Sequence, residues 1–405
     1  MNKTILLKNL ANYVEDKISA DKLNKNNYIG VDNILPNRGG IKTSEYFYGK
    51  GKVTAFKKGD ILIGNIRPYF KKIWLATFDG GCDTDVLCIR PKEEELSSFL
   101  YSTLSTDFFF NYVVKGAKGS KMPRGDKKHI MEFPIMDISN KKVIGDFIVA
   151  INEKIANNNA ISKELESMAK TIYDYWFLQF EFPDKDGKPY KSNGGKMVWN
   201  DQLKQEIPEG WEVGTIEDLG EIISGGTPST KKKDYYSKKG IAWLTPNDLS
   251  NSHNKYITHG ERDITKEGLE NSSARLMPKG TVLLTSRAPI GYLGIAINKV
   301  TTNQGFKSIV PKKTFGSEYI YYTLKNLIPY LKSVGTGSTF TEISKTVLKD
   351  VKIPIPAESV VSYFENIVSS LGTKHRINET ENQQLQSLRD FLLPILMNGQ
   401  VTIED

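Results

Sequence analysis

A seam of apolar and small residues runs through residues 144–176, and it is too long and too narrow for the core of a small globular domain. Its members recur in alternating steps of four and three: Ile144, Ile148, Ile151, Ile155, Asn158, Ser162, Leu165, Ala169, Ile172 and Trp176. This period predicts a coiled-coil helix, which at about 1.5 Å per residue is roughly 50 Å long. The seam is polar in its middle, at Asn158 and Ser162, and such positions favour one partner in one register.

A second seam of the same kind follows Pro354 and Pro356. Its members are Phe364, Ile367, Leu371, Lys374, Asn378, Glu381, Leu385, Leu388, Leu392 and Ile395. Its middle is polar as well, so each stretch is the expected partner of the other. We predict two long antiparallel helices that form a coiled coil within one chain, with the apolar members of both seams at their contact.

The two seams repeat each other at an offset of 220 residues, since Leu371 follows Ile151 and Leu385 follows Leu165 by that number. The same offset matches residues elsewhere: Arg67 with Arg287, Pro91 with Pro311, Tyr101 with Tyr321, Val114 with Val334 and Pro134 with Pro354. Self-similarity at a fixed offset indicates a tandem duplication. The chain is predicted to hold two related globular units with pseudo-two-fold repetition, each followed by a long helix.

Both globular units carry strand and helix signals, so we predict an α+β fold with two mixed α/β domains separated by the long helices. The expected strands lie at 53–56, 60–66, 73–78 and 86–90, and at 281–286, 292–298 and 305–310. One further helix is expected in each copy, at 93–114 and 317–334. The predicted divisions are a first domain over 1–138, a long helix over 139–180, a connector and second domain over 181–356, and a second long helix over 357–405.

Basic residues outnumber acidic ones, with 55 Lys and Arg against 47 Asp and Glu and a formal net charge of +8. This balance favours a polyanionic partner, although charge alone is a weak indicator. The charge is concentrated in residues 115–128, which hold six basic residues, one acid and three glycines. This segment predicts a basic loop.

The two cysteines, Cys82 and Cys88, lie six residues apart, which excludes a disulfide framework and favours a reduced cytosolic setting. No apolar run approaches the ~18 residues of a membrane span, and the first residues lack the core of a signal peptide. We therefore expect a cytoplasmic protein with no membrane partner.

Patterns that suggest catalysis or metal binding fail on inspection. Gly225-Gly226 is not followed by the Gly-Lys-Ser/Thr of a phosphate-binding loop. Asp184, Asp186 and Lys188 are residue types of a metal-dependent nuclease, but they lie together in a connector with no strand to present them. The four histidines show no helical pairing or acidic neighbour that suggests zinc, and methyltransferase motifs are missing. We expect a non-catalytic chain without a metal site.

Six short motifs, in order along the chain, accompany this duplicated architecture. They are Tyr28-Ile-Gly-Val-Asp-Asn33, Gly59-Asp-Ile-Leu-Ile-Gly-Asn-Ile-Arg-Pro68, Ile207-Pro-Glu-Gly-Trp211, Gly225-Gly-Thr-Pro-Ser-Thr230, Trp243-Leu-Thr-Pro-Asn-Asp248 and Leu392-Leu-Pro-Ile-Leu-Met-Asn-Gly-Gln400. Together they resemble the specificity (S) subunit of Type I restriction-modification enzymes. The resemblance covers essentially the whole chain.

The resemblance implies that each unit is a target recognition domain that reads one half of a bipartite site in double-stranded DNA. It also implies that the helices set the unread spacer and dock two methyltransferase (M) subunits, with nuclease and translocase activities on restriction (R) subunits. The methyl donor, Mg and ATP would be bound only by partner subunits. A rigid helix pair suits this role, because two reading modules must be held about a helical turn of duplex apart, roughly 34 Å or a multiple.

DNA affinity would rest on basic side chains that bind phosphates, and specificity on a few side chains that contact base edges. The candidate basic contacts lie in two loops: Lys115, Lys118, Lys121, Arg124, Lys127, Lys128, Lys231, Lys232 and Lys233. The candidate base contacts are Arg67, Arg287, Thr245, Asn247, Asp248, Asn303 and Gln304. The alternatives are structural salt bridges for the two arginines and ordinary turn roles for the other five.

The alternative function is a non-catalytic coiled-coil scaffold, whose helices recruit protein partners while its basic loops only solvate it. Binding of duplex DNA in the presence of the methyltransferase partner separates the two hypotheses. The scaffold would not bind, whereas the specificity subunit would.

Overall fold

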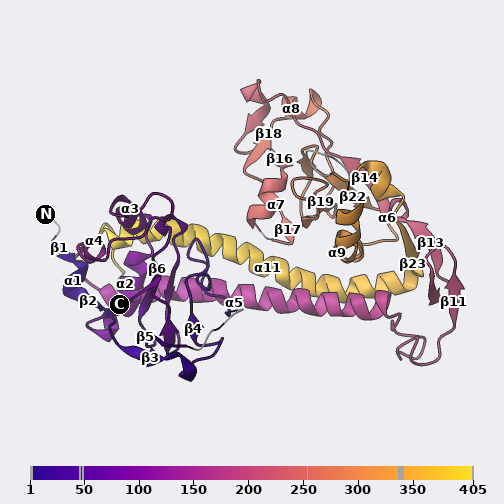
Figure 1. Cartoon of the computed structure of the whole chain (residues 1–405). Coiled ribbons are helices and arrows are strands. Elements are labelled where there is room, and N and C mark those ends of the chain that lie inside the picture. The colour runs from indigo at the N-terminus through magenta and orange to yellow at the C-terminus, as the bar shows by residue number, and fades with distance from the viewer. Residues whose placement is uncertain (1–2, 45–46, 48–49, 253, 336–341, 404–405) are drawn as a thin grey trace. The chain divides into compact units, whose positions relative to one another are not determined.

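The computed structural model describes residues 3–44, 47, 50–252, 254–335 and 342–403, and its fold is mixed α and β. The chain packs as two compact units. The first unit consists of Met1–Asn157 and Asn382–Asp405, and the second of Asn158–Glu381. Each unit therefore contains one globular domain and a part of each of the two long helices (Figure 1).

The domain of the first unit is built from two four-stranded sheets and a separate strand pair. The first sheet has the order β2 (Ala11–Tyr13), β9 (Val86–Pro91), β6 (Ile61–Gly64) and β7 (Ile73–Leu75). The second has the order β3 (Lys17–Ser19), β5 (Lys52–Phe56), β8 (Gly80–Cys82) and β4 (Tyr28–Ile29). The strand pair, β1 (Thr4–Leu6) with β10 (Pro134–Met136), joins the two ends of the domain.

Side chains alternate along β6, so its sheet carries apolar groups on both faces. Ile61 and Ile63 are buried against the helices of the unit, whereas Leu62 is buried with Phe56 and Cys82 of the second sheet. The helices are α1 (Leu7–Leu10), α2 (Ser97–Leu104), α3 (Asp107–Lys115) and α4 (Lys127–Met131). The first sheet therefore has an apolar layer on each side.

The second unit repeats the first sheet, with one strand added, and the strand pair, but its second sheet has a different strand order. Its first sheet has the order β14 (Gly220–Ser224), β22 (Lys307–Pro311), β19 (Val282–Leu284), β20 (Leu293–Ala296) and β17 (Tyr256–Ile257). Its second sheet has the order β15 (Tyr236–Ser237), β18 (Arg262–Ile264), β16 (Ile241–Leu244) and β21 (Val300–Thr302). β13 (Glu212–Thr215) pairs with β23 (Lys352–Ile355) as β1 pairs with β10. Both copies also share one parallel pair, β4 with β8 and β16 with β21, which confirms the predicted duplication.

Shorter elements complete the second unit. They are the connector hairpin of β11 (Met197–Asn200) and β12 (Gln205–Pro208), and the helices α6 (Ile216–Leu219), α7 (Pro246–Ser252), α8 (Lys266–Glu270) and α10 (Lys345–Lys349). Among the residues that the structure describes, no helix combines the length and the apolar character needed to cross a bilayer.

The helices that follow the sheets differ between the two copies. The second copy has one helix, α9 (Ser317–Val334), at the predicted place. In the first copy the predicted single helix over 93–114 is wrong, because α2 ends at Leu104 and α3 begins at Asp107. Thr106 makes the break: its backbone is extended and its hydroxyl accepts a hydrogen bond from the Phe109 amide at 3.1 Å. A threonine in this arrangement is a helix N-cap.

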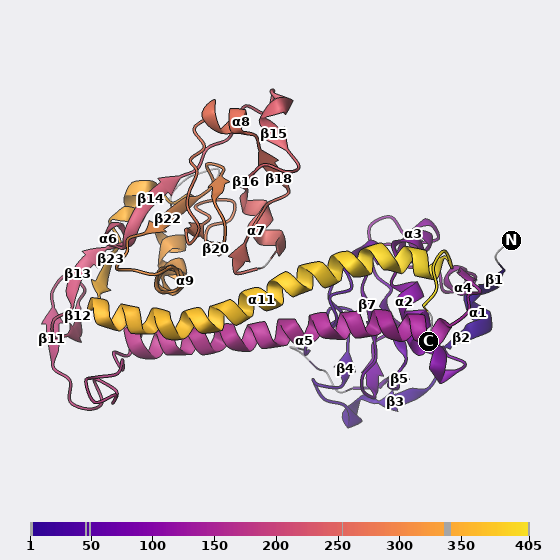
Figure 2. The same cartoon turned by 180° about the vertical axis from the view of Figure 1, so that it is seen from behind.

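The long helices, α5 (Lys141–Tyr173) and α11 (Glu358–Met397), run side by side in opposite directions (Figures 1 and 2). Hydrogen bonds cross the pair at three levels: Asn152 with Arg389 (3.0 Å), Asn158 with Glu381 (2.7 Å) and Ser162 with Asn378 (3.4 Å). Residue numbers rise along one helix as they fall along the other, so the pair is antiparallel. The polar middle of the first seam is buried and hydrogen-bonded to the polar middle of the second.

The two predicted seams are buried to different degrees. On α5, Ile144, Ile148, Ile151, Ile155 and Leu165 are buried and Ile172 is partly buried. On α11, Ile367, Leu371, Leu385 and Leu392 are only partly buried. Leu388 is 44% exposed, so its assignment to the seam is wrong, and Arg389 faces α5 in its place. α11 also packs against the globular domains, through residues such as Phe364 and Leu393, so its buried face is wider than a seam and is shifted from it.

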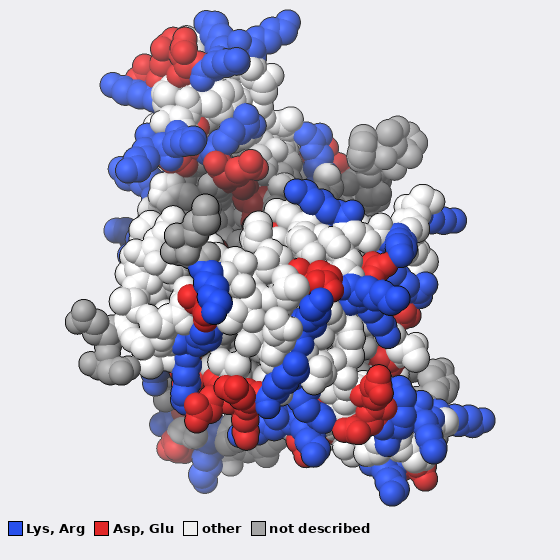
Figure 3. Space-filling view, turned by 90° about the vertical axis from the view of Figure 1, so that its left-hand side faces the viewer, with Lys and Arg blue, Asp and Glu red and all other residues white. Residues whose placement is uncertain are grey.

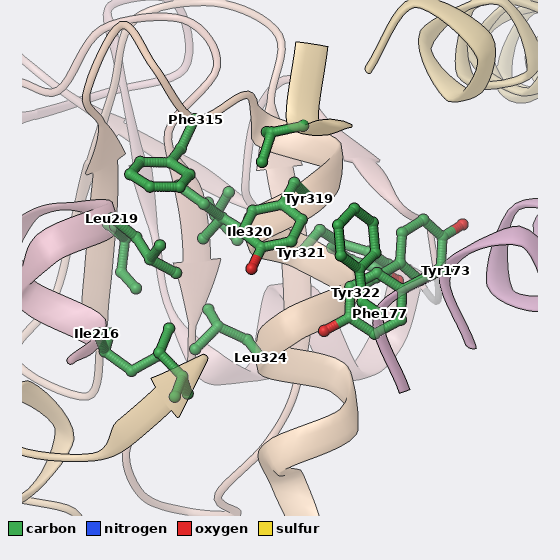
Figure 4. Close-up of a cluster of buried hydrophobic side chains, with 14 of the residues drawn as sticks. Tyr173, Phe177, Ile216, Leu219, Phe315, Tyr319, Ile320, Tyr321, Tyr322 and Leu324 are labelled. Atoms are coloured by element: carbon green, nitrogen blue, oxygen red, sulfur yellow. The ribbon is translucent and has the colours of Figure 1, made fainter. Parts of the chain in front are cut away.

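Aromatic rings join the long helices to the core of the second unit. Figure 4 shows Tyr173, the last residue of α5, and Phe177, in the short π-helix that follows it (Asp174–Leu178), beside the tyrosines of α9. The Phe177 ring lies 4.9 Å from that of Tyr319 and 5.1 Å from that of Phe364 of α11, both edge to face. Such pairs stabilise a core by more than their buried area alone. The long helices are therefore part of the domain core.

Replacing Phe364 by Ala is expected to lower the free energy of unfolding by about 3–5 kcal/mol, because a fully buried ring leaves a cavity. Urea unfolding followed by tryptophan fluorescence measures the loss. Phe391→Ala is the matched control, since Phe391 lies on the same helix but is 68% exposed, and it should change the free energy of unfolding by less than about 0.5 kcal/mol. Equal losses in both variants would contradict the packing described for α11.

Candidate nucleic-acid interface

Four segments meet at an equivalent place in each copy, and most of the predicted base contacts lie there. We call the first set the first loop junction, formed by residues 30–33, 65–67, 83–85 and 123–126. The second loop junction is formed by residues 245–248, 285–287, 303–305 and 342–343. Each junction gathers the ends of two strands and two loops. Backbone hydrogen bonds link these segments, either directly or through the adjacent residues Ile29 and Leu244.

Asp83 organises the first loop junction. Its carboxylate accepts hydrogen bonds from the amides of Val31 at 3.1 Å and Asp85 at 2.9 Å. Burial raises the pKa of Asp83, against the opposing effect of these amides. Asn33 closes the neighbouring turn by accepting from the Gly30 amide at 2.7 Å. The loops are thus held by side chains that are themselves partly or fully buried.

The second loop junction is held in the same way by three of the predicted base contacts. The Asp248 carboxylate accepts hydrogen bonds from the Thr245 amide at 2.7 Å, the Thr245 hydroxyl at 2.6 Å and the Glu261 amide at 2.7 Å. The Asn303 carbonyl oxygen accepts from the Gly305 amide at 2.8 Å. In this structure Thr245, Asp248 and Asn303 therefore serve turns, the alternative role considered from the sequence. Asn303 is equivalent to Asp83 at the offset of 220.

Two further predicted contacts of this junction, Asn247 and Gln304, are exposed. The Gln304 side chain accepts a hydrogen bond from the Thr227 hydroxyl, which ties it to the glycine loop. Gly225 is required there, because a Cβ atom at this position would lie 2.1 Å from the Asn303 carbonyl oxygen. Gly225 and Gly226 thus allow the loop to pack closely against its neighbours.

Arg67 shows two signs of strain in the first loop junction. Its backbone is left-handed, with φ of 51°, and its Nε is buried with no hydrogen-bond partner in the described part of the chain. Asn65, two residues earlier, is 8% exposed and its buried Oδ1 also lacks a partner among the described residues. Strained backbones and unpaired buried polar atoms cluster at binding sites. A ligand that forms hydrogen bonds with the Arg67 Nε and the Asn65 Oδ1 would remove the cost of leaving these two atoms unpaired.

Arg287, the counterpart of Arg67, is in contact with an acid. Its guanidinium lies 3.4 Å from the Glu342 carboxylate, which also lies 3.2 Å from the ammonium of Lys307. Glu342 forms a backbone bridge with Arg287 itself, whereas Arg124 forms one with Ile66, the residue before Arg67, and pairs with Asp85 at 3.0 Å. The segment beside the strand end thus contributes an arginine in the first junction and an acid in the second.

In the predicted basic loop, residues 115–128, some residues already contact one another. Lys118 and Arg124 exchange two backbone hydrogen bonds of 2.9 Å, and the Lys118 side chain pairs with Asp126. Lys118, together with the amides of His129 and Lys128, lowers the pKa of Asp126 to about 2. The remaining lysines, Lys115, Lys121, Lys127 and Lys128, are exposed, and the Lys127 ammonium lies 5.8 Å from the ring of Tyr13. Three of these four have no ion pair or ring contact in the structure as described.

Basic side chains are spread over the first unit. On the face seen in Figure 3, Lys and Arg alternate with Asp and Glu around an uncharged centre. In the second unit, Lys231, Lys232 and Lys233 are all exposed in the loop before Tyr235. Lys232 reaches the Tyr235 hydroxyl at 2.8 Å, which raises the pKa of the lysine. Exposed, dispersed charge of this kind suits contacts to a phosphate backbone.

No group of three His, Cys, Asp or Glu suited to a metal ion is present within the described ranges. Two histidines do have an acidic neighbour, since His259 lies 3.2 Å from Asp263 and His375 lies 3.2 Å from Glu379, but each is a pair of two groups and not the set of ligands that zinc requires. Both pairs are four residues apart. In the connector, Asp184 accepts hydrogen bonds from the amides of Asp186 and Lys188, and it therefore holds a turn.

The sequence reasoning missed five polar residues in or beside the two junctions. They are Asn65, Asp83, Asp85 and Glu342, together with Lys307 of β22, which lies just outside the second junction and contacts Glu342. The 220-residue offset was a usable signal for Asp83, because it leads there from Asn303. It does not lead to Glu342, because the residue at that offset is Met122, which lies outside the first loop junction.

A family model and a solved structure show which class of protein this chain resembles. Residues 208–388 match the family model of the Type I restriction modification DNA specificity domain. A solved structure, the S subunit of a Type I restriction-modification system from M. genitalium, has the same fold, with a TM-score of 0.61 and 15% identity over 100% of this chain and 96% of that one. The second domain and most of α11 thus match this family model, and the chain as a whole shares the fold of that S subunit.

Curated relatives extend the similarity in sequence to most of the chain. The MjaIX specificity subunit of a Type I restriction enzyme from Methanocaldococcus jannaschii is 44% identical over 197 residues, which are 45% of each chain. The HindI specificity subunit from Haemophilus influenzae is 25% identical over 86% of this chain and 87% of its own. The first match thus spans less than half of the relative's length. The protein is related, over most of its length, to the specificity subunits of Type I restriction enzymes.

Proposed function

We propose that this protein is the DNA-reading specificity subunit of a Type I restriction-modification complex, and that each unit reads one half of a bipartite DNA site. The observation that carries this proposal is the pair of loop junctions. They share a backbone frame, yet they differ in the side chains that they present. Recognition of two different half-sites requires two copies of one backbone arrangement that present different polar side chains.

The chemistry of the junctions suits base edges in the major groove. An arginine fork donates two hydrogen bonds to guanine, and a carboxylate accepts one from cytosine. The first junction offers Arg67 and Arg124, whereas the second offers Arg287 beside the acid Glu342. The two units would therefore prefer different bases. The ion pairs of Arg124 and Arg287 are about one third to one half exposed, so a base can compete for them.

We further propose that the helix pair sets the spacer between the half-sites and docks two methyltransferase subunits. Large apolar side chains are exposed along these helices: Phe147, Ile161 and Met168 on α5, and Tyr363, Ile377, Leu388 and Phe391 on α11. Met168 and Leu388 are equivalent positions, 220 residues apart. A duplicated chain with an equivalent apolar position on each helix can bind two copies of one partner.

In this proposal the catalytic work belongs to other subunits. Methyl transfer would lie on the methyltransferase, and nuclease and translocase activities on the restriction subunit, with their methyl donor, Mg and ATP. The test is co-expression with the methyltransferase partner, followed by methylome sequencing of the cells. Methylation at one bipartite sequence is expected. If the complex forms but neither binds nor methylates DNA selectively, the scaffold hypothesis replaces this one.

Replacing Lys121, Lys127 and Lys128 by Ala is expected to weaken the binding of all duplexes alike, because phosphate contacts carry no base information. If all three lysines bind phosphates, the slope of log affinity against log salt concentration shrinks by about 2.7. Titration of duplexes at several salt concentrations measures the slope. Lys118 is left in place because it pairs with Asp126 at the cap of α4.

The matched control for this experiment is the triple replacement of Lys185, Lys188 and Lys191, three exposed lysines of the connector. It removes the same charge and should leave the slope unchanged. Equal slopes for the two triple variants would mean that general charge, and not this loop, attracts the DNA. A change of sequence preference in the first variant would assign the loop to base reading.

A further inference from the structure

The second unit buries a lysine at the start of β17. The Lys255 side chain is 4% exposed, and its ammonium lies 2.7 Å from the Glu318 carboxylate and 3.2 Å from that of Glu166. It also donates to the Tyr322 hydroxyl at 3.0 Å and lies 4.6 Å from the centre of the Tyr321 ring. Glu166 belongs to α5, whereas Glu318 and both tyrosines belong to α9.

α11 completes this set, which we call the Lys255 cluster. The Glu379 carboxylate accepts hydrogen bonds from the backbone amides of Lys255 at 2.8 Å and Tyr256 at 3.1 Å. The Tyr256 hydroxyl donates to Glu318 at 2.6 Å, and His375 lies 3.2 Å from Glu379. Side chains of three helices thus converge on Lys255 and on Tyr256, the first residue of β17.

Two features show how closely this cluster is fitted. Gly372 lies inside α11, where glycine costs about 1 kcal/mol relative to alanine. A Cβ atom there would lie 2.1 Å from the Tyr256 hydroxyl, so glycine is what lets the strand approach the helix. Although burial alone would raise it, the pKa of Glu166 is lowered to about 2 by the ammonium groups of Lys255 and Lys325. The attraction between the Glu166 carboxylate and the two ammonium groups therefore outweighs the cost of burying its charge.

A buried ion network is a poor way to gain stability, because desolvation offsets much of the attraction between its charges. Its hydrogen bonds are directional, however, and they fix one geometry where apolar contacts would tolerate several. The first unit has a simpler contact at the equivalent place: Ser98, the counterpart of Glu318, donates to Asp146 of α5 at 2.6 Å. The cluster is thus a feature of the second copy, and its benefit is geometric.

The cluster lies directly after the segment that carries three predicted base contacts. α7 begins at Pro246, next to Thr245 of the second loop junction, and it leads to Lys255 within a few residues. We infer that the Lys255 cluster is a positioning device, which fixes the second loop junction on the helix pair so that the second unit reads its half-site at one distance along the DNA. This inference rests on the proposed function.

The test is the binding of the chain, in complex with its methyltransferase partner, to duplexes whose spacer is native or one base pair longer or shorter. One base pair moves a half-site by about 3.4 Å and turns it by roughly 35°. Lys255→Met should reduce the preference for the native spacer by about tenfold, while the penalty for a mismatch inside either half-site is unchanged. Lys349→Met is the matched control, since it breaks an exposed ion pair with Glu217 in the same unit.

A second variant keeps every charge. Gly372→Ala should push Tyr256 away from α11 and relax the spacer preference as Lys255→Met does. Adding Tyr256→Phe removes the hydroxyl that clashes and should restore part of the preference. If Lys255→Met does not fold, this pair of variants decides the question.

The outcomes separate the inference from the proposed function. Folded variants with the native spacer preference, or with weaker discrimination inside the half-sites, would overturn the positioning role. A wild-type complex that does not distinguish duplex sequences at all would instead overturn the proposed function. Relaxed spacing with intact half-site discrimination supports both.

Discussion

Exchanging residues 1–138 for the matching unit of a relative is expected to change one half of the recognised DNA site and leave the other half unchanged. Each domain has its own core and its own loop junction, so the base contacts that we propose would be exchanged together with the domain. A mismatched base pair costs about 1–3 kcal/mol. Two changed pairs therefore shift the preference between old and new sites by a factor of roughly 30 to more than 10,000.

The structure sets the condition for a chimera that folds. The core of the first unit includes Ile144 and Ile148 of α5 and Leu396 and Met397 of α11, and the Thr103 hydroxyl contacts the Met397 sulfur at 3.2 Å. The donor must keep the residues that face these four side chains. The exchange is best made between Met136, where β10 ends, and Lys141, where α5 begins.

Methylome sequencing of cells that express the chimera and its methyltransferase partner measures the result. The reciprocal exchange of the second domain, residues 207–356, is the control and should change the other half-site. If either exchange alters both halves, the two units read DNA jointly and the modular reading is wrong.

Inserting one heptad into each long helix is expected to abolish recognition of the native site and to create a site whose spacer is about three base pairs longer. A heptad adds about 10 Å of helix, and three base pairs span about the same distance. The seam is preserved because a heptad is its full repeat. Both half-site sequences should be retained, since neither loop junction is altered.

The antiparallel register decides where the insertions go. Asn152 faces Arg389 and Asn158 faces Glu381, so an insertion after Ala156 must be matched by one after Gln383. The position that repeats Ala156 in the sequence, Arg376, is not the position that faces it. Insertions placed by the repeat would misalign the hydrogen bonds of Asn158 and Ser162 with α11.

The longer spacer also turns one half-site about the duplex by roughly 100°, so some loss of affinity is expected. Methylome sequencing of the double-insertion variant identifies the new spacer. A variant with the single insertion in α5 is the control, and it should lose activity because its helix pair is out of register. An active double variant with the native spacer would show that the helices do not measure the site.

The sequence by itself determined the duplication and the helix pair. A period of 3.5 is a local property of side-chain type, and a repeat is visible as a fixed offset. For the same reason the buried residues of α5 were predicted well, from Ile144 to Leu165, because one face of this helix is buried along its length. Even the polar middle at Asn158 was predicted, since polar residues at seam positions stand out against an apolar pattern.

Only the tertiary structure decided how polar residues are used. α11 packs on α5 and on the domains at once, so periodicity alone placed Leu388 in the contact where Arg389 lies. Thr245 and Asp248 have the side chains of base readers, but a neighbouring turn takes their hydrogen bonds. Whether a polar atom is free depends on what the fold places within about 3 Å of it, and sequence spacing does not contain that distance.

The Lys255 cluster is the clearest case of this limit. Its charged members, Glu166, Lys255, Glu318 and Glu379, are spread over more than 200 residues and come from four different elements. In the sequence, each of them looks like an ordinary surface residue of a helix or a loop. They become a single buried network because β17 and three helices meet at one point, and long-range packing of that kind is set by the whole fold, not by any local pattern.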